Sequence, residues 1–203
     1  MLHLAVFASG RGSNLRAIDQ AILDGQLDAR IVAVISNRAA SGALDFAREH
    51  GIPALSLSEI AAEAEDSWLQ EQLAKCGCDF ISLAGYMKLL PAGVVSAYRH
   101  RITNIHPALL PSFGGKGMFG RHVHEAVIAS GAKVSGATVH LVDEEYDRGP
   151  IVMQRCVPIA DDDTAERLAT RVLEIEHRIY PESLQLFADG RVTVRDNKTS
   201  IRS

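Results

Sequence analysis

Short apolar runs alternate with amphipathic helical patterns through the first half of this chain, and this alternation limits its fold more than any other feature. The strand-like runs lie near residues 2–8, 31–36, 79–84 and 102–105. The helical patterns lie near residues 13–24, 41–50 and 59–76. Strands joined by helical crossovers pair in parallel, and right-handed crossovers bring their carboxyl ends to one edge of the sheet. The amino-terminal half is therefore predicted to be a parallel α/β structure.

The carboxyl-terminal half departs from this alternation. Strand patterns near 134–142 and 150–158 are joined by an acidic loop that is too short for a helical crossover, so these strands are expected to pair antiparallel. A long helix follows, capped near 161–164 and ending near Phe187. The predicted fold is an α/β, three-layer, doubly wound mixed sheet, mainly parallel in its first half and with an antiparallel hairpin in its second.

Length and charge limit what the chain can be. We expect one domain over residues 1–195 and a polar tail over 196–203 that frays. The formal net charge of −4 argues against a nucleic-acid surface, which needs a basic face. The cysteines, Cys76, Cys78 and Cys156, are odd in number and include a pair too closely spaced for an ordinary disulfide, which indicates reduced thiols. No apolar run approaches the ~18 residues of a membrane span, so a soluble, cytoplasmic protein is expected.

An amide and an imidazole lie together at the end of the fourth apolar run. Asn104 and His106 are two residues apart, so their side chains point to the same face of a strand. Pro107 cannot donate a ladder hydrogen bond, which indicates that the strand stops there and presents both side chains to a pocket. The alternative is a purely local role, in which backbone groups at the strand end satisfy both side chains.

A glycine-containing turn follows the first apolar run. Gly10 and Gly12 permit positive φ and close backbone approach, while Ser13 and Asn14 offer N-cap chemistry to a helix that begins there. Free N–H groups at such a helix start attract phosphate. A dinucleotide fingerprint requires a third glycine where Leu15 stands, so a phosphomonoester fits better than NAD. The alternative is a plain strand-to-helix turn.

An acidic loop follows the strand that contains His140. Its carboxylates are Asp143, Glu144, Glu145 and Asp147. Such a loop is normally solvated, but a carboxylate beside an imidazole raises the histidine pKa and orients the ring. Composition alone does not choose among the four.

Two further segments follow Pro107. The glycine-rich stretch from Phe113 to Gly120, with its glycines at Gly114–Gly120, is expected to be a mobile lid. His122 and His124 precede Glu125 at a helix start, a pattern more typical of capping and surface residues than of metal ligands. No His and Cys cluster has metal-ligand spacing, so no metal is expected.

In their order and spacing, these segments resemble the folate-dependent formyltransferases. The likeness extends over nearly the whole chain and includes the Ser-Gly-Arg-Gly-Ser-Asn loop at 9–14, Leu83-Ala84-Gly85-Tyr86-Met87-Lys88, Asn104-Ile105-His106-Pro107, His140, Asp147-Arg148-Gly149-Pro150 and Glu176-His177-Arg178-Ile179-Tyr180-Pro181. The most similar branch of the family acts on phosphoribosylglycinamide in purine biosynthesis. The resemblance implies transfer of a formyl group from 10-formyltetrahydrofolate, as co-substrate, to the amine of 5-phosphoribosylglycinamide.

The resemblance also implies roles for individual residues. The implied catalytic residues are Asn104, His106 and Asp147. Among the four carboxylates of the acidic loop the resemblance selects Asp147, because only Asp147 immediately precedes the Arg-Gly-Pro that matches the family's turn. Asn104 would donate to the oxyanion, His106 would move the proton, and Asp147 would keep His106 charged or order a relay water. The implied substrate-binding residues are Arg11, Gly12, Ser13, Asn14 and Glu176. The implied folate-binding residues are Met87, Lys88, Leu89, Leu90, Asn104, Asp143, Glu144, Glu145, Tyr146 and Asp147.

Two features depart from the family pattern. Lys88 stands where arginine is frequent, and Glu59 to Trp68 shows no counterpart of a further basic folate contact. Lysine keeps the charge but loses the bidentate fork, so preference for the folate tail can differ. We expect only small-molecule partners, no nucleic acid and no membrane, and a monomer or homodimer.

Related classes of protein provide the alternatives. Methionyl-tRNA formyltransferases add a carboxyl-terminal tRNA-binding domain, for which we expect no residues after about 195. Formyl-folate hydrolases add an amino-terminal regulatory domain, whereas this sequence starts at the first predicted strand. Sugar-amine formyltransferases share the core, but the phosphate loop argues against them. A non-catalytic phosphate-binding module is also consistent with this fold and leaves the catalytic residues without a role.

Overall fold

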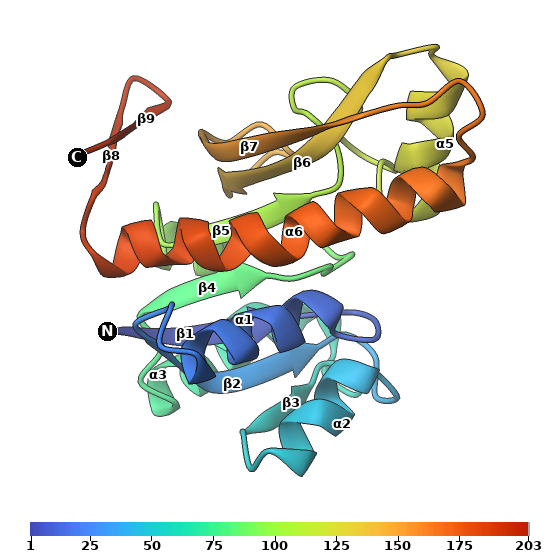
Figure 1. Cartoon of the computed structure of the whole chain (residues 1–203). Helices are drawn as coiled ribbons and strands as arrows, with labels where there is room; N and C mark the ends of the chain where they lie inside the picture. Colours follow the sequence, from blue (N-terminus) through green and yellow to red (C-terminus); the bar gives the residue numbers. More distant parts are fainter. Residues whose placement is uncertain (203) are drawn as a thin grey trace.

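The computed structural model describes residues 1–202 and contains a seven-stranded sheet in the order β3-β2-β1-β4-β5-β6-β7 (Figure 1). The strands of this sheet are β1 (Leu2–Phe7), β2 (Ala29–Ser36), β3 (Ala54–Ser56), β4 (Phe80–Leu83), β5 (Ile102–His106), β6 (Val134–Leu141) and β7 (Ile151–Pro158). The helices are α1 (Ser13–Leu23), α2 (Gly42–Glu49), the 3-10 helix η1 (Ala62–Ala64), α3 (Glu65–Lys75), α4 (Ala92–Ala97), α5 (Arg121–Ala129) and α6 (Ala165–Ala188).

The pairing directions confirm the predicted mixed sheet. The pairs β1 with β2, β2 with β3, β1 with β4 and β4 with β5 are parallel. Strand β6 pairs antiparallel with both β5 and β7. The long helix α6 begins where its capping signal predicts, because the Thr164 hydroxyl accepts a hydrogen bond from the Arg167 N–H at 3.3 Å. No helix within residues 1–202 is long and apolar enough to cross a membrane.

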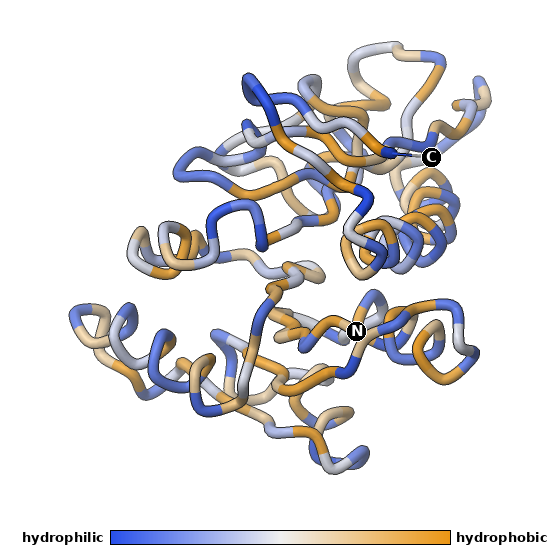
Figure 2. The backbone as a smooth tube through the Cα atoms, turned by 90° about the vertical axis from the view of Figure 1, so that its left-hand side faces the viewer, coloured by the Kyte–Doolittle hydropathy of each residue, from blue (hydrophilic) through white to orange (hydrophobic). Residues whose placement is uncertain are grey.

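Alternate residues of the central strands face two separate hydrophobic cores. Leu4 and Val6 of β1 belong to the core that also contains residues of α1, α2, α5 and α6. Ala5 and Phe7 belong to the core that contains residues of α3 and α4. Figure 1 shows α1 and α6 crossing one face of the sheet, and in Figure 2 hydrophobic and hydrophilic residues alternate along the helices. The three-layer, doubly wound arrangement is therefore confirmed.

The carboxyl-terminal segment differs from the predicted frayed tail. Strands β8 (Val192–Arg195) and β9 (Lys198–Ile201) form an antiparallel hairpin. Asp196 and Asn197 both have positive φ, 49° and 57°, the backbone of a tight two-residue hairpin turn. The Thr199 hydroxyl donates to the Ile151 carbonyl at 2.5 Å, which attaches the hairpin to β7. The expectation was wrong because a polar composition concealed the turn signal.

The strand order reverses at β1 and β4, and this topology opens a crevice at their carboxyl ends. The segments that follow these two strands are bonded to each other across the crevice. The Ser9 N–H donates to the Gly85 carbonyl at 3.1 Å, and the Ser9 hydroxyl accepts from the Met87 N–H at 2.9 Å. The predicted convergence of distant segments at one sheet edge is therefore observed.

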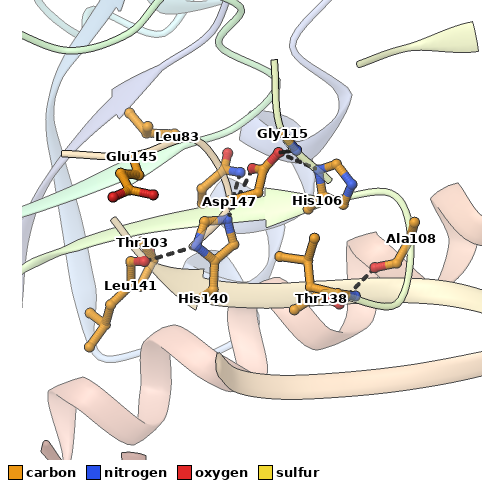
Figure 3. Close-up of polar contacts among 12 residues, drawn as sticks. Leu83, Thr103, His106, Ala108, Gly115, Thr138, His140, Leu141, Glu145 and Asp147 are labelled. Carbon is orange, nitrogen blue, oxygen red and sulfur yellow. Dashed lines mark hydrogen bonds and ion pairs between the residues drawn. The ribbon is translucent and has the colours of Figure 1, made fainter. Parts of the chain in front are cut away.

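Thr138 of β6 holds the turn that follows β5. Its buried hydroxyl donates to the Ala108 carbonyl at 2.6 Å (Figure 3) and accepts from the Leu110 N–H at 3.0 Å. The Gln154 side-chain amide donates to the same oxygen at 3.0 Å. These bonds fix the direction of the chain just after Pro107.

Replacing Thr138 with valine keeps the side-chain shape but removes this hydroxyl. The Ala108 carbonyl and the Leu110 N–H then lose a buried partner, so we expect Thr138→Val to lower the free energy of unfolding by about 2–4 kcal/mol in urea titrations. Thr170→Val is the control, because Thr170 is exposed on α6 and, among residues 1–202, its hydroxyl bonds only to the Glu166 carbonyl, at 3.0 Å. Equal losses in the two variants would contradict this account.

Candidate active site

A cavity of about 750 Å³ occupies the crevice. This volume is typical of a site that takes small-molecule ligands. Segments far apart in the sequence line the cavity: the glycine loop after β1, the loop after β4, the end of β5, the glycine-rich loop, the acidic loop and α6.

Asn104 and His140 meet because they are directly opposite each other in the β5–β6 ladder. The Asn104 side-chain Nδ2 lies 3.1 Å from His140 Nε2. The other ring nitrogen, His140 Nδ1, lies 2.8 Å from the Leu141 carbonyl, which can only accept, so Nδ1 carries a proton. In the neutral ring Nε2 therefore accepts from Asn104, and the second N–H of the Asn104 amide remains available for a ligand.

His106 is buried with one ring nitrogen committed. Its Nε2 donates to the Phe113 carbonyl at 2.8 Å, and its Nδ1 lies 3.6 Å from Asp147 Oδ2. Burial lowers the pKa of His106 below its ordinary value, although the Asp147 carboxylate and the Phe113 carbonyl oppose this shift. Of the two roles expected of Asp147, this lowered pKa does not favour keeping His106 charged and leaves the ordering of a relay water as a prediction. The shift favours the neutral ring, whose Nδ1 can accept a proton.

Asp147 is held between the two histidines (Figure 3). Its Oδ2 accepts from the Gly115 N–H at 2.8 Å, and its Oδ1 lies 3.5 Å from His140 Nε2. Burial opposes ionisation of Asp147, but a proton on either neighbouring histidine ring and the Gly115 N–H favour the carboxylate, and together they lower the pKa of Asp147. The residue has φ of 55°, a left-handed conformation that aspartate tolerates better than most side chains. The structure therefore brings together all three residues that the resemblance marked as catalytic.

The glycine loop is arranged differently from the predicted cap. Gly12 is the N-cap of α1 with φ of 77°, and neither Ser13 nor Asn14 caps the helix with its side chain. The first N–H groups of α1 therefore keep their capacity to bind an anion.

Asn14 is bonded across the cavity to α6 instead. Its amide donates to Glu176 Oε2 at 2.7 Å, and its Oδ1 is buried without a protein partner within residues 1–202. Burial raises the pKa of Glu176 to about 7, although the bond from Asn14 opposes the rise. Arg11, Gly12, Ser13, Asn14 and Glu176, the predicted substrate-binding residues, all line the cavity.

The predicted folate-binding residues divide into two groups. Those that line the cavity are Met87, Lys88, Leu89, Leu90, Asn104, Glu145, Tyr146 and Asp147. Asp143 and Glu144 line a separate cavity of about 120 Å³. Glu144 is paired there with Arg99 at 2.9 Å, and Asp143 accepts from the Glu145 N–H at 3.0 Å.

The predicted site residues did not include two histidines that lie at the site. His140 lies near the carboxyl end of β6, and its placement depends on the β5–β6 register, which the local sequence does not reveal. His124 was expected at the surface, but it is only 5% exposed, lines the cavity and has Nδ1 without a protein partner within residues 1–202. Its neighbour His122 is exposed as predicted. The same described residues contain no group of three or more His, Cys, Asp or Glu side chains placed to hold a metal ion.

Comparison with known proteins places the chain among formyl transferases. The family model described as "Formyl transferase" matches residues 2–184. Phosphoribosylglycinamide formyltransferase from Escherichia coli is 36% identical over 199 residues, covering 97% of this chain and 92% of that protein. The chloroplastic phosphoribosylglycinamide formyltransferase of Arabidopsis thaliana is 46% identical over 198 residues, covering 96% of this chain and 68% of that protein.

Solved structures are similar over the whole chain. Glycinamide ribonucleotide transformylase 1 from Symbiobacterium toebii has a TM-score of 0.93 at 39% identity and covers 100% of this chain and 95% of its own. A formyltetrahydrofolate deformylase from Pseudomonas syringae has a TM-score of 0.88 at 28% identity, with 100% of this chain covered and 67% of its own. Some relatives are longer: the chain spans 62% of the protein from Vigna unguiculata and 19% of the trifunctional protein from Bos taurus.

The raised pKa of Glu176 makes stability depend on pH. As pH rises from 4.5 to 7, the unfolded chain releases this proton before the folded chain does, so the Glu176 contribution to stability is lost. We expect Glu176→Gln, which cannot titrate, to match the wild type near pH 4.5 and to exceed its unfolding free energy by at most about 3 kcal/mol at pH 8. Urea titrations at both pH values measure this difference. Glu174→Gln, at an exposed site on α6, is the control and leaves the pH dependence unchanged.

Proposed function

The chain belongs to the formyl transferase family, and we propose that it transfers a formyl group from 10-formyltetrahydrofolate to the amine of 5-phosphoribosylglycinamide. The products are formylglycinamide ribonucleotide and tetrahydrofolate, a step of de novo purine biosynthesis. The observation that carries the proposal is the convergence of Asn104, His106 and Asp147 in the same cavity as the open start of α1. Formyl chemistry and phosphate binding are thus supported within one site.

Asn104 stabilises the oxyanion in this proposal. When the amine attacks the formyl carbon, the carbonyl oxygen gains negative charge and needs a donor that is already oriented. The bond to His140 Nε2 at 3.1 Å fixes the amide and leaves its second N–H for this oxygen. A donor of this kind contributes roughly 3–4 kcal/mol to transition-state stabilisation in acyl transfer.

His106 and Asp147 move the proton. The bond to the Phe113 carbonyl leaves Nδ1 as the basic nitrogen of His106, and this nitrogen faces the Asp147 carboxylate. As the new C–N bond forms, the nitrogen of the amine loses a proton to Nδ1, and Asp147 stabilises the resulting imidazolium. The same proton is then delivered to the folate nitrogen as the old C–N bond breaks. No covalent enzyme intermediate is required.

The ligands divide between the two ends of the cavity. Gly12 and Ser13 at the start of α1 hold the phosphate, and Glu176 with Asn14 holds the ribose or glycinamide portion. The folate lies along Met87–Leu90 and the Glu145–Asp147 part of the acidic loop. The proposal includes no metal and no nucleic-acid partner, a monomer or homodimer, one domain that extends through the β8–β9 hairpin, and a cytoplasmic location.

An acceptor comparison tests the reaction. The purified protein is mixed with 10-formyltetrahydrofolate and with glycinamide ribonucleotide, methionine-charged tRNA or buffer alone, and release of deformylated folate is followed spectroscopically. We expect release only with glycinamide ribonucleotide. Release in buffer alone would instead indicate the hydrolysis named for the Pseudomonas syringae relative. Phosphate-ligand binding without any turnover would indicate a non-catalytic module.

Substitutions test the roles of the three residues. We expect Asn104→Asp, which cannot donate when ionised, to lower kcat about 10²- to 10³-fold. We expect His106→Ala and Asp147→Asn each to lower kcat about 10²- to 10⁴-fold, because each removes part of the proton path. The matched control is His122→Ala, which removes an exposed imidazole of α5 and leaves kcat unchanged. Near-normal turnover in His106→Ala or Asp147→Asn would contradict the mechanism.

A further inference from the structure

A buried carboxylate lies behind the one lysine of the loop that follows β4. Glu65 is the first residue of α3, and its side chain is only 4% exposed. Its Oε2 accepts a hydrogen bond from the Lys88 ammonium, whose side chain is 46% exposed. Lys88 lines the cavity, whereas Glu65 does not. The pair therefore presents a cation to the ligand with its counter-charge directly behind it.

Several features keep this carboxylate in place. It lies at the amino end of α3, where the helix dipole favours negative charge. Its neighbour Asp66 anchors the same turn, because Asp66 Oδ2 accepts from the Gly93 N–H at 3.0 Å. Burial raises the pKa of the nearby Tyr86 hydroxyl, and the Glu65 charge raises it further. Within residues 1–202 Glu65 Oε1 has no partner, so Lys88 provides the only hydrogen bond to this side chain.

The position of Lys88 determines which part of a ligand it contacts. The assignment of that part to the formyl donor rests on the proposed function. The acceptor phosphate lies at the glycine loop and the reacting carbon lies at Asn104, so the donor extends along Met87–Leu90. A folate ends in a glutamate tail, and each added glutamate brings another carboxylate. The lysines and arginines that line the cavity are Arg11, Lys88, Lys116 and Arg121. Only Lys88 belongs to the Met87–Leu90 segment.

We infer that Glu65 is a specificity-determining residue for the formyl donor, because it neutralises Lys88 and makes the cavity insensitive to the length of the donor's anionic tail. A lysine without a paired carboxylate attracts the glutamate tail more strongly as the negative charge of the tail grows. A lysine bonded to a carboxylate forms a neutral pair whose field falls off more steeply. The enzyme therefore uses monoglutamate and triglutamate donors with similar kcat/KM.

The wild-type protein tests this inference directly. kcat/KM is measured for 10-formyltetrahydrofolate with one and with three glutamates at low ionic strength and again in high salt. We expect a ratio of triglutamate to monoglutamate close to one that changes little with salt. A strong preference for the triglutamate that salt abolishes would overturn the inference.

The Glu65→Gln variant keeps the side-chain size and an oxygen that can accept from Lys88, but it removes the negative charge. We expect the ratio to rise about threefold to tenfold at low salt, through KM rather than kcat, and the rise to disappear in high salt. In a Lys88→Met background, Glu65→Gln leaves the ratio of triglutamate to monoglutamate kcat/KM unchanged, because there is no lysine charge for the Glu65 carboxylate to neutralise. Melting temperatures establish that each variant is folded.

Glu71→Gln is the matched control. Glu71 lies on the same helix, forms an exposed pair with Lys75 at 2.8 Å, and its substitution changes the net charge equally. Equal ratios in Glu65→Gln and Glu71→Gln, or a rise that persists without Lys88, would overturn the inference. Failure of the proposed function is distinguishable, because the wild type would then transfer no formyl group to glycinamide ribonucleotide from either donor.

Discussion

The antiparallel pairing of β5 with β6 is the interaction on which the site depends. Its register places Asn104 opposite His140 and His106 opposite Thr138. A slip by one residue would turn every side chain of the strand to the other face of the sheet. The pair between them, Ile105 opposite Val139, is buried in the larger hydrophobic core and opposes such a slip. The orientation of the polar site therefore follows from the packing of apolar residues.

The sequence predicted those parts of the structure that local patterns determine. The parallel half, the hairpin of β6 and β7 and the Thr164 cap of α6 depend on periodicity and capping residues within a few positions. The roles of His140 and Glu65 were not predictable in this way, because each depends on a partner more than 20 residues away. The Asp196–Asn197 turn was local, but its polar composition resembled that of a frayed end.

Burial outweighs the neighbouring groups in setting the protonation states of His106 and Glu176, whereas at Asp147 the neighbours outweigh burial. His106 has a carboxylate beside it, yet its pKa falls because the ring is removed from water. Glu176 has a donor in Asn14, yet burial raises its pKa to about 7. In both groups burial therefore favours the neutral form, and shifted groups of this kind are typical of functional sites. Residue type alone, without burial, would have assigned His106 and Glu176 their ordinary pKa values.

The turn at Phe113 and Gly115 bonds to two of the proposed catalytic residues at once. The Phe113 carbonyl fixes the tautomer of His106, and the Gly115 N–H holds the Asp147 carboxylate. A displacement of this turn would break both bonds together, so the His106 ring and the Asp147 carboxylate would lose their orientation at the same time. One short turn therefore couples the orientation of the imidazole to the placement of the carboxylate, so neither group can be repositioned without the other.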